Sequence, residues 1–153
     1  MIEWQWGSYT DLDRDSLFEI LQARQAIFIV EQDCPYPDID HLDLLSWHLI
    51  GWLKESNRKE LIAYMRVTLP GEKYKEPSIG RVLTTQRVRG QGIGIELMRE
   101  GIARTEQQYP NIPIRIGAQV YLQKYYSSFG FENVGEPYDE DGIPHIEMLR
   151  NAS

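Results

Sequence analysis

The first residues of the chain alternate apolar and polar side chains, and this two-residue period is typical of a half-buried β-strand. The alternation covers residues 2–6. Two further apolar stretches, 47–53 and 61–69, flank a polar turn at 56–59. This order predicts a β-hairpin that follows the first strand at some distance along the chain.

A helix is predicted between the first strand and the hairpin. Ser16 and Glu19 have the spacing of a capping box, in which two side chains satisfy free N–H groups at a helix start. Leu17, Leu21 and Phe28 are expected on the inner side of this helix. Two prolines and three acidic residues then interrupt the pattern, which indicates a loop of defined shape.

The second half of the chain alternates predicted strands and helices. A strand at 78–84 runs into a glycine-rich turn, and apolar positions within 93–108 suit a helix packed on a sheet. Antiparallel strands followed by this alternation predict an α/β fold with a mixed, mostly antiparallel central sheet and flanking helices. The remaining expected elements are a strand at 112–116, a short helix at 119–128, and strands at 131–134 and 143–149.

The length and composition suit a protein with one buried core. At 153 residues, we expect a single domain spanning residues 1–153. No apolar run approaches the ~20 residues of a membrane span, and the first residues lack the regions of a signal peptide. The single cysteine, Cys34, excludes an internal disulfide and fits a reducing compartment. We therefore expect a cytoplasmic protein without a membrane partner.

The net charge narrows the choice of partner. A formal net charge of -7 argues against general nucleic-acid binding, which depends on neutralising phosphates with Lys and Arg. An acidic protein attracts cations such as amines more readily, although most acidic proteins are simply soluble.

Three glycines at alternate positions, Gly90, Gly92 and Gly94, separate the strand at 78–84 from the following helix. They remove side chains where a backbone must approach a ligand closely. The helix directs unpaired N–H groups and the positive end of its dipole toward this turn. Arg87 and Arg89 add positive charge beside it. The arrangement indicates a site for a phosphate group.

Two common nucleotide-binding motifs do not fit this turn. A Rossmann motif needs Gly-x-Gly-x-x-Gly early in a βαβ unit, whereas here the spacing is Gly-x-Gly-x-Gly after three strands. A Walker loop needs Gly-Lys-Ser/Thr, which this turn lacks. The other structural interpretation is a turn that only packs the helix closely against its neighbours.

The segment Arg87-Val-Arg-Gly-Gln-Gly92 resembles the Arg/Gln-x-x-Gly-x-Gly/Ala signature of the GCN5-related N-acetyltransferases (GNATs). Residues 119–131 resemble a later segment of that family, in which a polar residue opens a helix and a tyrosine precedes Gly-Phe. Four further stretches are similar to the ElaA-like branch of the family: 28–40, 79–82, 117–119 and 140–146. The resemblance covers nearly the whole chain.

The resemblance implies the acyl-CoA N-acyltransferase fold, with acetyl-CoA as co-substrate and no metal. In the family, backbone N–H groups of the glycine turn hold the pyrophosphate of acetyl-CoA, and the preceding strand pairs its main chain with the pantetheine arm. Gln119 stands where an asparagine often contacts the pantetheine. The cofactor-binding positions are then Val82, Leu83, Thr84, Arg87, Arg89, Gly90, Gln91, Gly92, Ile93, Gly94, Gln119 and Tyr126.

Tyr126 matches the family tyrosine that donates a proton to the departing CoA thiolate. A phenol at hydrogen-bond distance can protonate or stabilise this sulfur when an amine attacks the thioester. Tyr125 points about 100 degrees away on a helix and serves as the control. The structural alternative is that Tyr126 is a core aromatic that covers the cofactor arm.

The attacking amine must first lose a proton, and three residues near predicted segment ends are candidate bases: Glu31, His48 and His145. Each has a structural alternative. Glu31 is also suited to pairing with an arginine, His48 to a place within a strand, and His145 to a bond with the backbone. Direct loss of the proton to solvent, without a dedicated base, is a further option.

The loop after the first predicted helix gathers acidic residues that could bind a cationic substrate; a solvated loop is the other interpretation. The acids lack the EF-hand pattern of a metal site. Cys34 has no evident base beside it, so it is not expected to act as a nucleophile. The loop carries Asp33, Asp38, Asp40 and Asp43 beside Tyr36 and His41.

The sequence thus predicts an N-acetyltransferase that moves an acetyl group to a primary amine by direct attack in a ternary complex. The acceptor, either a small molecule or a peptide, stays open. A domain that binds acyl-CoA as a sensor or scaffold is the alternative function, and an enzyme that binds another phosphorylated ligand ranks below both. A homodimer is common in this fold. Trp4, Trp6, Trp47 and Trp52 are expected as core or cofactor-adjacent aromatics.

Overall fold

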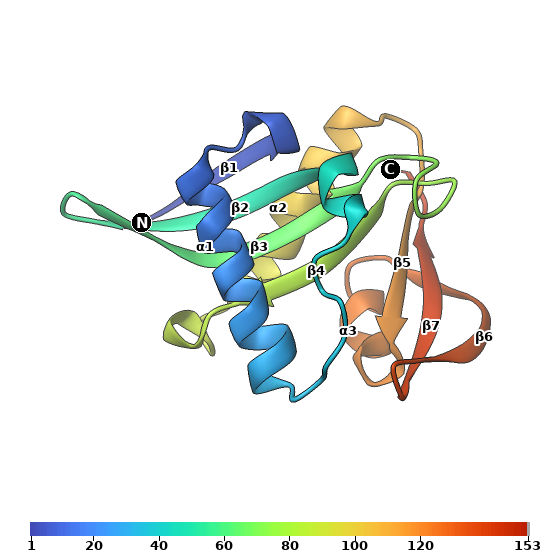
Figure 1. Cartoon of the computed structure of the whole chain (residues 1–153). Coiled ribbons are helices and arrows are strands. Elements are labelled where there is room, and N and C mark those ends of the chain that lie inside the picture. Colours follow the sequence, from blue (N-terminus) through green and yellow to red (C-terminus); the bar gives the residue numbers. More distant parts are fainter. Residues whose placement is uncertain (153) are drawn as a thin grey trace.

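The computed structural model describes residues 1–152, in which one seven-stranded sheet runs through the molecule (Figure 1). The strand order is β1-β2-β3-β4-β5-β7-β6, and all neighbours are antiparallel except β4 and β5. The predicted mixed, mostly antiparallel α/β sheet is confirmed. The strands are β1 (Ile2–Ser8), β2 (Ser46–Glu55), β3 (Arg58–Thr68), β4 (Ser78–Thr84), β5 (Ile114–Gln119), β6 (Glu132–Glu140) and β7 (Ile143–Arg150).

Helices cover both faces of this sheet. Helix α1 (Arg14–Arg24) continues into the π-helical segment η2 (Gln25–Glu31) on one face, and α2 (Ile93–Gln108) lies on the other (Figure 1). The short helix α3 (Gln123–Ser127) lies near β5. Short 3-10 turns join these elements: η1 (Tyr9–Asp11), η3 (His41–Leu45), η4 (Gln86–Val88) and η5 (Val120–Leu122).

The start of α1 differs from the expected capping box. Asp13 caps the helix, and its carboxylate accepts a hydrogen bond from the backbone N–H of Ser16 at 2.7 Å. Ser16 therefore lies in the first turn of the helix, where it is buried. Helix α1 buries Ser16, Ile20 and Arg24, whereas Leu17 is only partly covered. The expectation of an inward-facing Phe28 is confirmed, whereas Leu17 and Leu21 are only partly covered because the buried face of α1 carries Ser16, Ile20 and Arg24 instead.

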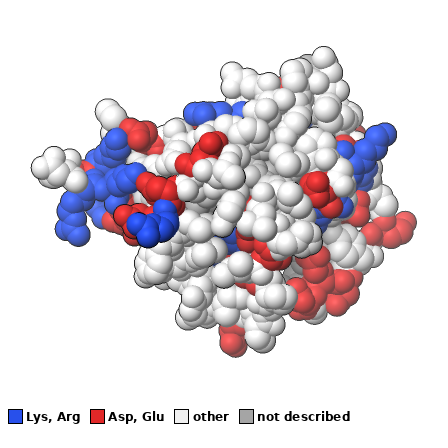
Figure 2. Space-filling view, turned by 45° about the horizontal axis from the view of Figure 1, so that its top comes forward, with Lys and Arg blue, Asp and Glu red and all other residues white. Residues whose placement is uncertain are grey.

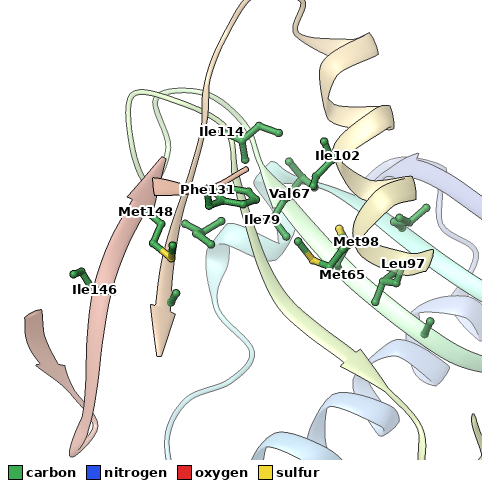
Figure 3. Packing of buried hydrophobic residues seen from close by; sticks show 14 residues of the cluster. Met65, Val67, Ile79, Leu97, Met98, Ile102, Ile114, Phe131, Ile146 and Met148 are labelled. Atoms are coloured by element: carbon green, nitrogen blue, oxygen red, sulfur yellow. The ribbon is translucent and has the colours of Figure 1, made fainter. Parts of the chain in front are cut away.

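The larger core lies between α2 and the sheet and extends to β7 (Figure 3). Leu97, Met98 and Ile102 of α2 pack there against Met65 of β3. Gly101 allows the close approach of α2, because a Cβ atom at this position would overlap the Met65 thioether. The second core, beneath α1, contains Ile20, Phe28, Ile50, Trp52, Leu61, Tyr64 and Leu83.

Strands β4 and β5 pair only at their beginnings, through Ser78 and Arg115. A bulge in β4 follows, because both Arg81 and Val82 lie opposite the single residue Met65 of β3. Arg81 has a φ of 50°, in the left-handed region that non-glycine residues rarely occupy. A bulge bends its strand, and here the two parallel strands separate beyond this point. The sheet therefore stays continuous but contains a wedge-shaped opening.

Three arginines and three aspartates form an ion cluster between α1, the loop that follows it, and the sheet. Arg24, with 1% of its surface exposed, donates to Asp38 at 2.9 Å and to Asp43 at 2.6 Å. Arg66 of β3 donates to Asp43 at 2.9 Å. Because each buried charge has opposite charges beside it, the cluster avoids the large cost of an isolated buried ion.

The same cluster reaches the bulge in β4. The Arg81 Nε lies 2.8 Å from Asp38 Oδ1, and Arg66 lies 2.6 Å from Asp40 Oδ1. The ring of Tyr36 lies 5.4 Å from the Arg81 guanidinium. The loop 33–43 is thus fastened to β4 at the residue that has the strained backbone conformation.

No helix within residues 1–152 combines the length and apolar composition that crossing a membrane requires.

Asp43→Asn should lower the free energy of unfolding by about 3 kcal/mol, because it removes a buried carboxylate from both Arg24 and Arg66. Urea titration followed by circular dichroism measures the effect. Asp33→Asn is the matched control, since Asp33 is exposed in the same loop, and it should change the free energy by less than about 0.5 kcal/mol. Equal effects of the two substitutions would contradict a structural role for the cluster.

The same variant should alter the response to acid. Burial opposes ionisation of Asp43, but the hydrogen bonds and charges of Arg24 and Arg66 outweigh it and lower the pKa of this carboxyl. Its contribution to stability is therefore present above the unfolded pKa of about 3.9 and is lost as the pH falls through the lower folded pKa. The stability difference between native protein and Asp43→Asn should narrow below about pH 4.

Candidate functional site

A cleft opens where β4 and β5 separate, and we call it the β4–β5 cleft. Ile79–Val82 of β4 form one wall, and Ile116, Gly117 and Gln119 of β5 form the other. Tyr126 of α3 also lines the cleft. The mouth on the α1 side is lined by Phe28, Gln32, Cys34, Tyr36, Lys73, Glu140, Asp141, Ile143 and His145.

At the end of β4 lies the predicted glycine turn, residues 89–94, which we call the glycine corner. Gly90 and Gly92 have φ angles of 80° and 78°, which side-chain-bearing residues adopt only with strain. A Cβ atom at either position would meet no atom within 4 Å, so the space in front of the backbone is open. Helix α2 begins directly after Gly92. Its first N–H groups have no acceptor within the helix and are free to bind an anion.

The two arginines beside the corner are already paired with carboxylates. Arg87 contacts Glu55 and Glu60 of the β2–β3 hairpin, and Arg89 lies 2.8 Å from Glu31. Their positive charge is therefore largely balanced in this structure. The attraction for an anion comes mainly from the backbone N–H groups and the helix dipole.

Tyr126 extends from α3 into the β4–β5 cleft. Burial, with smaller contributions from Tyr125 and Tyr121, raises the pKa of its phenol to about 12. The hydroxyl therefore keeps its proton at neutral pH. Tyr125 has a different place, because its hydroxyl lies 3.5 Å from the position of a Cβ added to Gly94. Of the two neighbouring tyrosines, only Tyr126 lines the cleft.

His145 lies on β7 at the mouth of the cleft, with only 7% of its surface exposed. Its Nδ1 is 2.8 Å from the backbone oxygen of Ile143, which can only accept, so Nδ1 carries a hydrogen. Its Nε2 lies 3.3 Å from the carboxylate of Glu140. The ring stacks on Tyr138 with a centroid distance of 5.8 Å. This geometry fixes the ring and leaves Nε2 as the nitrogen able to accept a proton.

The other two candidate bases lie elsewhere. His48 is buried in the sheet, where its ring nitrogens lie 2.7 Å from the hydroxyl of Tyr64 and 2.9 Å from the backbone oxygen of Asp43. Burial lowers the pKa of His48, so its ring is neutral. Glu31 pairs with Arg89 and is not among the residues that line the cleft. Of the three, His145 alone is placed in the cleft.

Of the strand positions predicted to contact a cofactor arm, Val82 lines the cleft, and Leu83 and Thr84 follow it along β4. Leu83 and Thr84 pair with Tyr64 and Ala63 of β3, so one edge of β4 is already paired within the sheet. The other edge faces the opening, where β4 has separated from β5. Gln119 of β5 lies opposite His145 of β7 and lines the cleft.

The acidic loop has a different role from either interpretation given above. Asp38 and Asp43 are neither solvated nor available to a cation, because Arg24, Arg66 and Arg81 neutralise them. A local pattern of acids could not show this, since the arginines come from distant parts of the chain. Within residues 1–152, no group of three or more His, Cys, Asp or Glu side chains is arranged to hold a metal ion.

Sequence reasoning missed Glu140, Asp141 and Arg81 as residues of the cleft wall. The stretches 79–82 and 140–146 had been singled out by resemblance alone, and no chemical pattern in them indicated a site.

Comparison with known proteins gives the class that this fold and cleft define. A family model described as "Acetyltransferase (GNAT) domain" matches residues 54–151. The chain belongs to this GNAT family, whose members use acyl-CoA. Protein ElaA of Escherichia coli is 42% identical over 154 residues, which cover 99% of this chain and 98% of that protein. The chain therefore lies in the ElaA-like branch of the family.

Solved structures agree with this assignment. The crystal structure of Escherichia coli ElaA superposes with a TM-score of 0.89 at 41% identity, covering 99% of this chain and 100% of that one. An acyl-CoA N-acyltransferase from Pseudomonas aeruginosa gives a TM-score of 0.91 at 38% identity, covering 98% of this chain and 99% of that one. The predicted GNAT fold and ElaA-like membership are confirmed.

Glu31→Gln should release Arg89 toward the glycine corner and lower the Kd of CoA up to about fivefold, the range of an exposed ion pair. The free energy of unfolding should change by less than about 1 kcal/mol. Isothermal titration calorimetry measures the Kd. In an Arg89→Gln background the same substitution should have no effect. A Glu31→Gln protein with unchanged affinity but a hundredfold lower kcat would instead make Glu31 the base.

Proposed function

We propose that this protein is an N-acetyltransferase that moves an acetyl group from acetyl-CoA to a primary amine in a ternary complex. The observation that carries the proposal is the β4–β5 cleft, which Val82, Tyr126 and His145 line, on the strand that precedes the open glycine corner. Strand β4 thus connects a suitable site for the phosphates of a donor with groups that can move protons.

The donor would bind along β4. Its pyrophosphate would accept hydrogen bonds from the N–H groups of the glycine corner, where no side chain blocks the approach. The pantetheine arm would then pair with the free edge of β4 at Val82, Leu83 and Thr84, as a further strand would. Gln119 would approach the arm from β5. This placement brings the thioester near Tyr126.

The reaction requires three proton transfers. The Nε2 atom of His145 takes a proton from the acceptor ammonium, and the resulting amine nitrogen attacks the thioester carbonyl carbon. A C–N bond forms, and the attacking nitrogen, now positively charged, loses its second proton to solvent. The C–S bond breaks, and the electron pair of that bond leaves on the CoA sulfur. Tyr126 donates its proton to this thiolate and is protonated again from solvent. Most of the rate enhancement comes from holding amine and thioester in contact.

Two alternatives are open to direct tests. A domain that senses acyl-CoA would bind the donor but release no free CoA in the presence of amines. An enzyme for another phosphorylated ligand would bind a nucleotide without pantetheine more tightly than CoA. The edge of β4 exposed by the bulge favours CoA over a nucleotide without pantetheine, because it offers backbone groups to an extended arm.

Gly92→Ala should raise the Kd of CoA at least about tenfold, because a methyl group would occupy the space reserved for the pyrophosphate. Calorimetric titration measures the Kd. Gly71→Ala is the matched control, since Gly71 also has a positive φ, 89°, and open space around its Cβ position. Both variants bear similar backbone strain, but only Gly92→Ala should weaken binding. Equal affinities would place the phosphates elsewhere.

Tyr126→Phe should lower kcat about a hundredfold, the lower range for loss of a general acid, with little change in the KM of acetyl-CoA. A steady-state assay that detects free CoA with a thiol reagent gives both kcat and KM. Tyr125→Phe should retain native turnover, because its hydroxyl lies beside the corner. If Tyr126→Phe turns over normally, Tyr126 is a packing residue and the thiolate leaves unaided.

A further inference from the structure

Lys73, in the loop between β3 and β4, lines the mouth of the β4–β5 cleft, where His145 also lies. The chain has five lysines, and the other four, all within residues 1–152, do not line the cleft. Lys54 and Lys59 belong to the β2–β3 hairpin, at the left end of the molecule, where Figure 2 shows many Lys and Arg side chains together. Lys73 is thus the lysine amine of the protein that opens onto this site.

The residue after Lys73 holds the loop against the wall of the cleft. The hydroxyl of Tyr74 lies 3.2 Å from the position of a Cβ added to Gly117 of β5, and its ring centroid lies 5.9 Å from the Arg115 guanidinium. The backbone oxygen of Tyr74 also accepts a hydrogen bond of 2.7 Å from Gly71, which closes the turn around Lys73. Because Gly117 lines the cleft, the side chain of Lys73 starts from a fixed point beside it.

The ammonium group of Lys73 has no fixed partner. Within the described part of the chain, residues 1–152, it forms no ion pair and no hydrogen bond. Its Nζ lies 5.5 Å from the ring centroid of Tyr74, a weak contact at an exposed site. Arg81, the other basic residue of the cleft, is held by Asp38 and Asp40. The flexible four-carbon stem therefore lets the Lys73 nitrogen move within the cleft.

The surroundings of Lys73 disfavour the charge that would keep its nitrogen from reacting. The side chain as a whole is exposed, but burial of its ammonium among protein atoms lowers the pKa of Lys73. Glu140 and Asp40 act in the opposite direction, and the cations Arg66 and Arg81 act in the same direction as burial. Only the neutral amine is a nucleophile, so a lower pKa raises the fraction that can attack.

We propose that Lys73 is an acetylation site of the protein itself, at which the lysine amine takes the acetyl group from acetyl-CoA bound in the cleft of the same chain. This inference rests on the proposed acetyl transfer. The Nζ atom loses a proton to solvent and attacks the thioester carbonyl carbon. A C–N bond forms, the nitrogen loses a second proton to solvent, and the C–S bond breaks with its electron pair on the CoA sulfur. The products are an acetylated Lys73 and free CoA.

The test incubates the native protein with acetyl-CoA and no added amine, and peptide mass spectrometry follows the acetylated fraction of each lysine. Lys75 is the matched control, because it is exposed in the same loop and does not line the cleft. Lys73 should be acetylated at least about tenfold faster than Lys75, since its amine is held beside the bound thioester. The first-order rate at Lys73 should not depend on protein concentration. Excess CoA should slow acetylation of Lys73 alone, because it occupies the donor site.

Release of CoA in the absence of an amine gives a second readout. The native protein should release a burst of CoA no larger than the amount of protein, because each chain carries a single Lys73. Lys73→Arg should abolish this burst, since a guanidinium keeps the positive charge but stays protonated and cannot attack. Lys75→Arg should retain the burst.

Equal acetylation of Lys73 and Lys75, unaffected by CoA, would overturn the inference and show only chemical acetylation of exposed amines. A rate at Lys73 that rises in proportion to protein concentration would exclude a step within one chain. Transfer to free amines without acetylation of Lys73 would overturn this inference and leave the proposed function intact. Binding of acetyl-CoA with acetylation of neither free amines nor Lys73 would overturn both.

Discussion

The structure depends on one local contact, between Arg81 at the bulge of β4 and the carboxylates of the loop after α1. Arg81 has a left-handed backbone conformation within a strand, which costs free energy and persists only where surrounding contacts stabilise it. Asp38 and Asp40 supply those contacts, and Arg24 and Arg66 hold the same carboxylates from α1 and β3. The bulge that results turns β4 away from β5 and opens the sheet.

The β4–β5 cleft brings together side chains from segments that are distant in the sequence. Tyr126 of α3 and His145 of β7 line it together with Val82 of β4, the strand that precedes the glycine corner. Burial raises the pKa of Tyr126 to about 12, so the phenol keeps its proton at neutral pH. The fastening of the loop by the ion cluster also fixes Tyr36 and Cys34 at the mouth. Structural charges and reactive groups thus occupy separate positions.

The sequence was sufficient for features that local spacing determines. The order of strands and helices, the glycine corner and the segment around Tyr126 all depend on neighbours within a few residues, and the structure places them as expected. The ion cluster could not be predicted, because Arg24, Asp43 and Arg66 lie on three distant elements. For the same reason the acids of the loop were misjudged, and a buried arginine took the place of an apolar residue on α1. Burial of charge is a property of the assembled fold.

CoA is proposed to bind in the β4–β5 cleft with its phosphates at the glycine corner. A titration of the ¹⁵N-labelled protein with CoA, followed by amide chemical shifts, tests it most directly. The largest shifts are expected at the N–H groups of Gly90, Gly92, Gly94 and Val82. Shifts concentrated in the β2–β3 hairpin, with the corner unchanged, would contradict it.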